Sequence, residues 1–394
     1  MRKTVAEREF LVHNYSEEKK MFNKFENYLK LAKNLVYYAC DLKPKEKVLI
    51  EESYVDPDFI CCLIEEVRKA GAYPFVISNN LNISKALLNG ITEEEAKLKT
   101  KYMLPIMQDM DAYITLRGKL NSFEESDIDT KYKQIDNIHF LTPVHLEERV
   151  NNTKWCILRW PNPSFAQSAG ISTDALNKLY FEVCTLDYAK MDKAMDRLVE
   201  SMEKTDKVRI VGNGTDITFS IKNQPAIKCS GKHNIPDGEV FTAPIKNSIN
   251  GVISFNIPTL YQGVRFDDIK LEVENGKIIN ATSSSNTKKL NEILDIDAGA
   301  RYFGEFAIGV NPYVKKPMLD ILFDEKICGS IHLTPGNDYE EAPNGNKSAI
   351  HWDMVLCQLE EFGGGEIYFD DVLIRKNGIF VPENLKCLNP DNLM

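Results

Sequence analysis

The stretch Lys47-Val-Leu-Ile-Glu51 decides the fold of the first half of this chain. Three consecutive apolar residues between charged ones predict a short, buried strand. Asp56 follows as a candidate N-cap for a helix that Gly71 ends, and Pro74-Phe-Val-Ile77 predicts a second strand. A strand, a helix and a strand in this order predict a βαβ unit with parallel strands.

The same alternation extends outward from this unit. Residues 17–40 carry apolar side chains at the spacing of a helix, and residues 172–204 form another long helical stretch. Asp111-Ala-Tyr-Ile-Thr-Leu116 and Trp155-Cys-Ile-Leu158 predict two more strands. We therefore expect an α/β N-terminal domain over residues 1–190, built on a mostly parallel sheet flanked by helices.

The second half of the chain alternates apolar and polar residues around Asn-Gly pairs. Residues 208–221, 271–279 and 372–381 each contain one such pair, at Asn213-Gly214, Asn275-Gly276 and Asn377-Gly378. Asn-Gly supplies the positive φ angles of a tight hairpin turn, so each segment predicts two antiparallel strands. We expect residues 191–394 to form a β-rich α+β C-terminal domain.

The composition is that of a globular chain of enzyme size. Its 394 residues are 43% apolar, carry a formal net charge of −10 and include nine cysteines. Acidic and basic residues are interspersed, and this negative balance argues against a nucleic-acid partner, whose phosphates require a basic surface. No segment approaches the roughly 20 apolar residues that a membrane span needs, so we expect no membrane partner. The missing apolar run at the start and the unpatterned cysteines predict a cytoplasmic protein.

Two of the six histidines, His332 and His351, stand out by their surroundings. In Ala-Ile-His-Trp-Asp-Met-Val, residues 349–355, His351 and Asp353 lie two positions apart and would leave the same face of a strand. On spacing alone, this pair is either metal-binding or an ordinary hydrogen-bonded pair. His332 stands where a predicted strand gives way to a turn, and such ends present ligands at the mouth of a cleft.

Three carboxylates, Glu239, Glu305 and Glu325, stand among apolar neighbours. A carboxylate is costly to bury unpaired, so a cation, either protein or metal, is expected near each of them. The sequence contains no His-Glu-x-x-His, which excludes the helix-borne zinc site of one large class of metallopeptidases.

An ordered set of motifs resembles the thermophilic-type aminopeptidases of metallopeptidase family M29. The motifs are Asn234-Ile-Pro-Asp-Gly-Glu-Val-Phe-Thr-Ala-Pro244, Gly299-Ala-Arg-Tyr-Phe-Gly-Glu305, Leu322-Phe-Asp-Glu325, His332 with Tyr339, and Ile350-His-Trp-Asp353. Stretches near residues 31–50 and 155–170 are also similar, so the resemblance covers residues 25–385. Each motif alone is short, and their common order carries the resemblance.

The resemblance implies a homodimer that removes N-terminal residues from short peptides with a free N-terminus. It implies two divalent metal ions per chain in the C-terminal domain, with the ligands Glu239, Glu305, Glu325, His332, His351 and Asp353. Carboxylates with two imidazoles suit Zn²⁺, Co²⁺ or Mn²⁺.

Three residues receive catalytic roles from this interpretation. We expect Glu305 to bridge the two ions and Glu239 to double as the base that accepts a proton from water. Tyr339 either donates to the oxyanion or only packs against its loop. The segment between Tyr339 and His351 is shorter than in many members of the family, so the pocket wall is expected to differ.

Two other functions stay open on the sequence. A mononuclear-iron ring-cleaving dioxygenase of related fold also uses a His-x-Asp pair, but one Fe(II) takes about three protein ligands and leaves no role for both Glu239 and Glu305. A non-catalytic binding module would be signalled by the loss of a ligand, whereas all the expected ligands are present. The sequence therefore favours a metallo-aminopeptidase.

Overall fold

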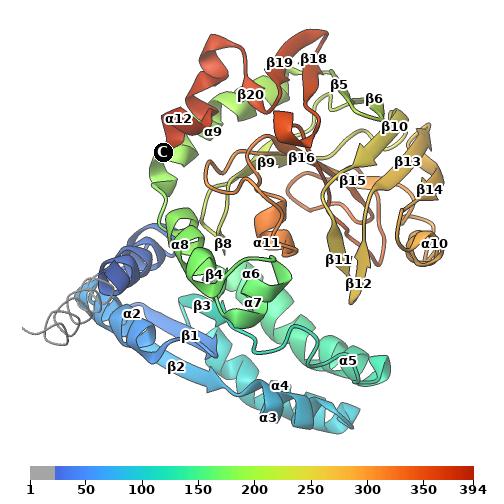
Figure 1. Ribbon diagram of the computed structural model, residues 1–394. Helices are drawn as coiled ribbons and strands as arrows, with labels where there is room; N and C mark the ends of the chain where they lie inside the picture. The colour runs from blue at the N-terminus through green and yellow to red at the C-terminus, as the bar shows by residue number, and fades with distance from the viewer. Residues whose placement is uncertain (1–22) are drawn as a thin grey trace, which may run out of the picture. The chain divides into compact units, whose positions relative to one another are not determined.

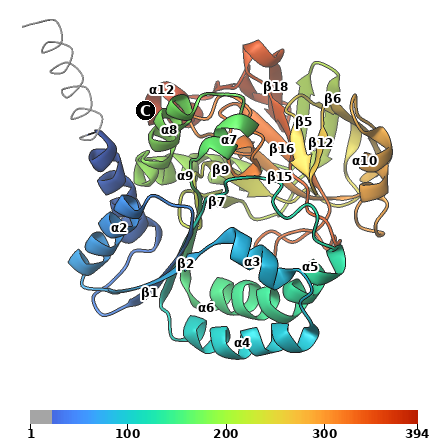
Figure 2. The same ribbon diagram turned by 60° about the horizontal axis from the view of Figure 1, so that its bottom comes forward.

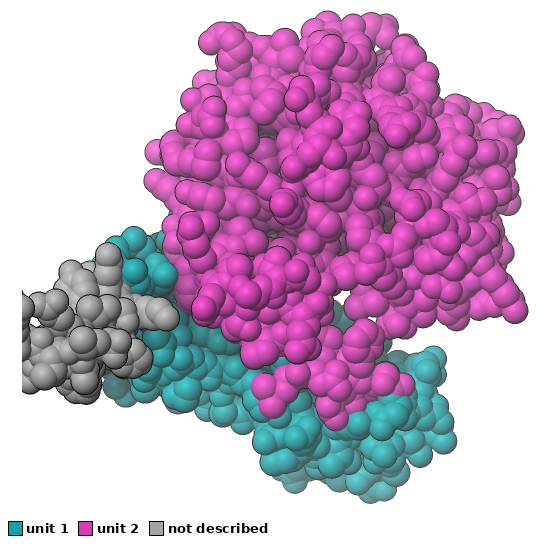
Figure 3. All heavy atoms as spheres, viewed as in Figure 1, with its two compact units in different colours: residues 1–119, 127–160 teal, residues 120–126, 161–394 magenta. Residues whose placement is uncertain are grey.

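The computed structural model describes residues 23–394 of the chain (Figure 1). These residues divide into two compact units, which Figure 3 distinguishes by colour. The first unit comprises residues 23–119 and 127–160, and the second comprises residues 120–126 and 161–394. The helix predicted over residues 17–40 begins outside the described residues, and from residue 23 the chain is helical through η1 (Asn34–Ala39).

The first unit is built on parallel strands, as the sequence predicts, and the structure gives their order as β2-β1-β3-β4. The strands are β1 (Lys47–Ser53), β2 (Tyr73–Asn79), β3 (Ala112–Arg117) and β4 (Lys154–Arg159). The other helices are α2 (Pro57–Lys69), α3 (Leu81–Leu88), α4 (Glu93–Gln108), α5 (Thr130–Asp136), η2 (Asn137–Arg149) and α6 (Val150–Asn152). Asp56 caps α2, because its side chain accepts a hydrogen bond from the backbone N–H of Asp58 at 2.9 Å.

Helix α4 packs along α5 and η2 in this unit (Figure 2). One apolar cluster joins α4 and η2 to the sheet and includes Leu49, Met107, Met110, Tyr113, Phe140 and Val144. His145 of η2 lies beside this cluster, with its ring 5.8 Å from that of Tyr113 and 5.6 Å from that of Phe140. Burial, and then the nearby Arg149, lower the pKa of His145 from 6.5 to about 4 against the opposing charge of Glu51.

Acid should therefore destabilise the protein through His145. Between pH 6.5 and 4 the unfolded chain binds a proton at this imidazole that the folded chain does not, so the free energy of unfolding falls as the pH falls. We expect His145→Phe, which keeps an aromatic ring, to remove about 2 kcal/mol of this loss. Urea unfolding at neutral and acidic pH measures it, and equal losses in both proteins would contradict the assignment.

The second unit is built mainly on antiparallel strands. An eight-stranded sheet has the order β14-β13-β10-β6-β5-β18-β19-β20, a five-stranded sheet has the order β17-β16-β15-β9-β7, and β11 pairs with β12. The strands before residue 260 are β5 (Lys207–Gly212), β6 (Thr215–Ser220), β7 (Ile227–Cys229), β8 (Asn234–Ile235), β9 (Glu239–Thr242), β10 (Asn250–Phe255) and β11 (Thr259–Tyr261). The later strands are β12 (Val264–Phe266), β13 (Ile269–Glu274), β14 (Lys277–Thr282), β15 (Phe303–Gly309), β16 (Ser330–Pro335), β17 (Met354–Cys357), β18 (Gly365–Phe369), β19 (Val372–Lys376) and β20 (Ile379–Phe380).

Helices in this unit are few and mostly short, apart from two near its start. They are α7 (Pro163–Ser168), α8 (Thr173–Cys184), α9 (Tyr188–Lys204), α10 (Thr287–Leu294), α11 (Ile321–Asp324), η3 (Glu360–Phe362), η4 (Glu383–Leu388) and α12 (Pro390–Leu393). None of the helices among the described residues is both long and apolar enough to cross a membrane.

All three hairpins predicted from Asn-Gly pairs are present, as β5-β6, β13-β14 and β19-β20. At the second turn Asn275 has a φ of 49° and Gly276 a φ of 82°. A Cβ atom at Gly276 would lie 1.8 Å from the carbonyl oxygen of Lys246, so this turn requires glycine for space as well as for conformation.

The chain passes from the first unit to the second for the last time after Trp160. The predicted domain boundary, at residue 190, lies instead inside α9 of the second unit. Helices α7 and α8 belong to the second unit because their aromatic side chains pack on α11. The rings of Phe165 and Tyr180 lie 5.2 Å and 6.4 Å from the ring of Phe323. Helical spacing in the sequence cannot tell which core a helix covers.

Candidate metal centre

The five-stranded sheet of the second unit brings three of the predicted ligands to one face. Ala307 of β15 pairs with His332 of β16 on one side and with Phe241 of β9 on the other. Directly paired residues share a face, and so do residues two apart on one strand. Glu239, two residues from Phe241, and Glu305, two residues from Ala307, therefore lie on the same face as His332.

Glu239, Glu305 and His332 form a first group whose ligand atoms all lie within 4.8 Å of one another. His332 Nε2 lies 3.3 Å from Glu305 Oε1 and 3.6 Å from Glu239 Oε2. All three residues are at least 95% buried. His332 was expected at the end of a strand, but the structure places it inside β16, because the strand continues to Pro335.

Glu305, His351 and Asp353 form a second group within the same distance. His351 Nε2 lies 3.1 Å from Glu305 Oε2 and 3.2 Å from Asp353 Oδ1. His351 and Asp353 precede β17, and His351 is held by an isolated bridge to Gly336. Glu305 is common to both groups and directs one carboxylate oxygen toward each imidazole.

Neighbouring polar groups orient the second group. His351 Nδ1 lies 2.8 Å from the carbonyl oxygen of Asn337, and since a carbonyl only accepts, Nδ1 carries a proton and Nε2 is the nitrogen that faces Glu305 and Asp353. The hydroxyl of Thr334 donates to Asp353 Oδ1 at 2.8 Å. Fixed orientations of this kind are characteristic of the residues that support metal ligands.

Carboxylates dominate the electrostatics of both ligand groups and favour cations beside them. Burial lowers the pKa of each imidazole, but the facing carboxylates outweigh it and raise the pKa of His332 to about 10 and that of His351 to about 12. Burial raises the pKa of Asp353, and the His351 charge and hydrogen bond more than reverse this, so its pKa lies well below the usual value.

The residues present fit divalent metal ions. Glu239 Oε2 is buried and has no hydrogen-bond partner among the described residues. An unpaired buried acceptor of this kind is rare, and Glu239 belongs to the first ligand group. Carboxylate oxygen and imidazole nitrogen are ligands that Zn²⁺, Co²⁺ and Mn²⁺ accept.

Glu325, the remaining predicted ligand, belongs to neither group of described residues. Its Oε1 lies 2.8 Å from the ammonium of Lys326, and burial, with Glu239 and Asp353 nearby, raises the pKa of Glu325 to about 8 against the opposing charge of Lys326. Lys326 is only 1% exposed and was missed by the sequence analysis. No local pattern in the sequence distinguishes this lysine from an exposed one.

Tyr339 lies beside the second group. Its ring centroid is 4.6 Å from that of His351 and 5.4 Å from that of Phe241, and the residue is 43% exposed. Burial and the carboxylates of Glu305 and Asp353 raise the pKa of Tyr339 well above its usual value, so the phenol stays protonated and can donate. The ring contacts with His351 and Phe241 also agree with a role of Tyr339 in packing alone.

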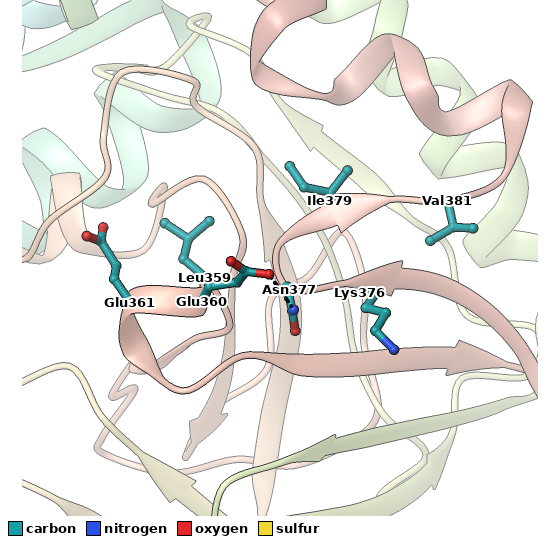
Figure 4. A pocket seen from close by; sticks show the side chains of 7 residues that line it. All are labelled: Leu359, Glu360, Glu361, Lys376, Asn377, Ile379 and Val381. Carbon is teal, nitrogen blue, oxygen red and sulfur yellow. Dashed lines mark hydrogen bonds between the residues drawn. The ribbon is translucent and has the colours of Figure 1, made fainter.

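A separate groove of about 710 Å³ opens on the second unit (Figure 4). None of the candidate ligands lines it, and its wall consists of Leu359, Glu360, Glu361, Lys376, Asn377, Ile379 and Val381. An Asn377 to Glu360 hydrogen bond of 3.0 Å closes part of its rim. This groove is therefore not part of the candidate metal centre.

Comparison with known proteins supports the resemblance seen in the sequence. The family model described as thermophilic metalloprotease (M29) matches residues 24–379. Aminopeptidase AmpS of Bacillus subtilis is 30% identical over 161 residues, which are 38% of this chain and 39% of that protein. Aminopeptidase PepS of Streptococcus thermophilus is 23% identical over 392 residues, covering 84% of this chain and 92% of that protein.

A solved structure, wild-type AmpT from Thermus thermophilus, shares the fold. The match has a TM-score of 0.76 at 19% identity and covers 91% of this chain and 99% of that chain. Aminopeptidase T of the same organism aligns with this chain over about a third of its own length, at 30% identity. The family match extends over most of the chain, so this protein belongs to the M29 family of thermophilic metalloproteases.

Proposed function

We propose that this protein is a metal-dependent aminopeptidase that releases N-terminal residues from short peptides at a site with two divalent metal ions. The observation that carries the proposal is the pair of ligand groups that share Glu305. The two groups comprise five ligands, with Glu305 common to both, and five exceed what one tetrahedral ion can use. The relatives AmpS, PepS and AmpT are named as aminopeptidases, which supports the substrate class.

Glu239, Glu305 and His332 would hold one ion, and Glu305, His351 and Asp353 the other. Bound Zn²⁺, Co²⁺ or Mn²⁺ would lower the pKa of water and polarise the scissile carbonyl. Glu239 is the candidate base, because its Oε2 has no hydrogen-bond partner among the described residues and could take a proton from water. Burial raises the pKa of Glu239, while Lys326 and His332 hold it down.

A free amino terminus suits the charge of this site. The ligand carboxylates of Glu239, Glu305 and Asp353 lie close together with Glu325 nearby, and they attract the cationic end of a peptide. Binding the amine fixes the position of the first peptide bond relative to Glu239 and Tyr339, so cleavage would stop after one residue. A mononuclear-iron dioxygenase would use only one of the two groups.

The test compares free and N-acetylated tetrapeptides in the presence of Co²⁺. Acetylation removes the charge and the basic lone pair of the amine while the scissile bond is unchanged, so we expect cleavage of the free peptides alone. Mass spectrometry should show loss of one residue at a time, and a Glu239→Gln variant serves as the inactive control. Equal cleavage of blocked peptides would exclude an exopeptidase, and oxygen uptake on a dihydroxypyridine without any cleavage would favour the dioxygenase.

Replacing Tyr339 distinguishes the two roles expected for it, donation to the oxyanion and packing against its loop. If the phenol donates to the oxyanion, Tyr339→Phe should lower kcat by about 10² to 10³, because the ring contacts with Phe241 and His351 remain while the donor is lost. Metal content should stay the same as in the wild type. An unchanged kcat would assign Tyr339 a packing role only.

A further inference from the structure

Lys326 is a buried cation beside the first ligand group. It follows α11, and its ammonium lies 2.6 Å from Glu239 Oε1, 2.8 Å from Glu325 Oε1 and 3.3 Å from Asp237 Oδ1. Burial alone would lower the pKa of Lys326, but the three carboxylates outweigh it and raise the pKa well above its usual value. The ammonium is therefore paired with three carboxylates in the folded protein.

The backbone around Lys326 keeps it in place. Its carbonyl oxygen accepts a hydrogen bond from Asn311 N at 3.1 Å, and Asn311 Nδ2 donates to the carbonyl of Asp237 at 2.7 Å. The Asp237 carboxylate accepts from Gly231 N at 2.7 Å. Gly238 has a φ of 135°, and a Cβ there would lie 2.9 Å from Asn311 Cβ, so this close approach requires glycine.

The two oxygens of Glu239 have different surroundings as a result. Oε1 is held by Lys326, whereas Oε2 lies 3.6 Å from His332 Nε2 and has no hydrogen-bond partner among the described residues. We infer that Lys326 is a positioning residue that occupies Glu239 Oε1 and leaves Oε2 as the single oxygen available to a metal ion or to water. This inference rests on the proposed function, a two-metal aminopeptidase. It adds to that enzyme a positioning residue that is not one of the metal ligands.

The charge of the cluster agrees with this role. Asp237, Glu239, Glu305, Glu325 and Asp353 supply five carboxylates around Lys326 and the ligand groups. The ammonium of Lys326 offsets part of this negative charge and occupies one oxygen of Glu239. Without Lys326, Glu239 would be free to turn both oxygens toward one ion.

The experiment compares the wild type with Lys326→Met, which keeps the length of the side chain but has no charge and no donor. Lys376→Met is the matched control, because Lys376 is exposed and pairs with a single carboxylate, Glu366. Each protein is freed of metal and titrated with Co²⁺, and three quantities are measured: ions bound per chain, the visible absorption of Co²⁺, and kcat and KM for a tetrapeptide with a free N-terminus.

We expect Lys326→Met to bind two ions with an altered Co²⁺ spectrum, and to lose about 10- to 100-fold in kcat with KM changed less than about threefold. A wild-type spectrum with wild-type kcat would overturn the inference. The inference would also be overturned if the loss of activity in Lys326→Met matched the fraction of protein without metal, because the metal-loaded molecules would then be fully active. A wild type that binds fewer than two ions or cleaves no peptide would overturn the proposed function and this inference with it.

A second variant covers the case in which Lys326→Met does not fold. Lys326→Gln retains an N–H donor for Glu239 Oε1 without the charge, and it is measured in the same way. A loss of kcat smaller than 100-fold, together with an altered Co²⁺ spectrum, supports the positioning role. An unchanged spectrum with an unchanged kcat overturns it.

Discussion

Replacing Glu305 by glutamine should remove both metal ions and lower kcat/KM by about 10³ or more. Glu305 is the only residue common to the two ligand groups among the described residues, and each of its oxygens lies next to a different imidazole. An amide keeps the shape of the side chain but has one oxygen and no charge, so it cannot serve two ions. Metal analysis of the purified variant, together with peptide hydrolysis, measures the effect.

Glu325→Gln is the matched control for this change. It also removes a buried carboxylate next to Lys326, but Glu325 stands outside both groups, so we expect two ions per chain to remain. Two ions retained in Glu305→Gln would show that the shared carboxylate is not a bridging ligand. An ion lost from Glu325→Gln would instead add Glu325 to the ligands, as the sequence predicts.

Removal of the metal should abolish activity, and Co²⁺, Zn²⁺ or Mn²⁺ should restore it. The ligands of the two groups would lose their ions to a chelator, and the enzyme would lose its source of activated water. We expect two ions per chain at full recovery, measured by metal analysis during the titration. A single tightly held iron, with no second ion bound, would contradict this expectation.

Binding of these ions should release protons. The raised pKa values of about 10 for His332 and about 12 for His351 mean that both imidazoles carry protons in the metal-free protein near neutral pH. A metal ion binds only the neutral imidazole, so about two protons per chain should leave, and metal affinity should weaken as the pH falls. Calorimetry in two buffers with different ionisation enthalpies measures the number released.

Local patterns in the sequence predicted the parallel strands of the first unit and three hairpins of the second. The βαβ unit follows from an apolar run, an N-cap at Asp56 and a glycine at residue 71, each of which acts through its nearest neighbours. The three hairpins follow from Asn-Gly pairs, because few other residues adopt the positive φ angles of these turns. The order of the motifs along the chain was also sufficient to identify the M29 family.

Only the tertiary structure decided how the candidate site is assembled. The register of β9, β15 and β16 joins Glu239, Glu305 and His332 across long stretches of chain, and strand register depends on contacts that no local pattern records. Packing of α7 and α8 on Phe323 likewise set the break between the units at Trp160. The position of Lys326 against three carboxylates could not be predicted, because adjacent charged residues look alike in a sequence, and only burial separates a solvated lysine from one that must be paired.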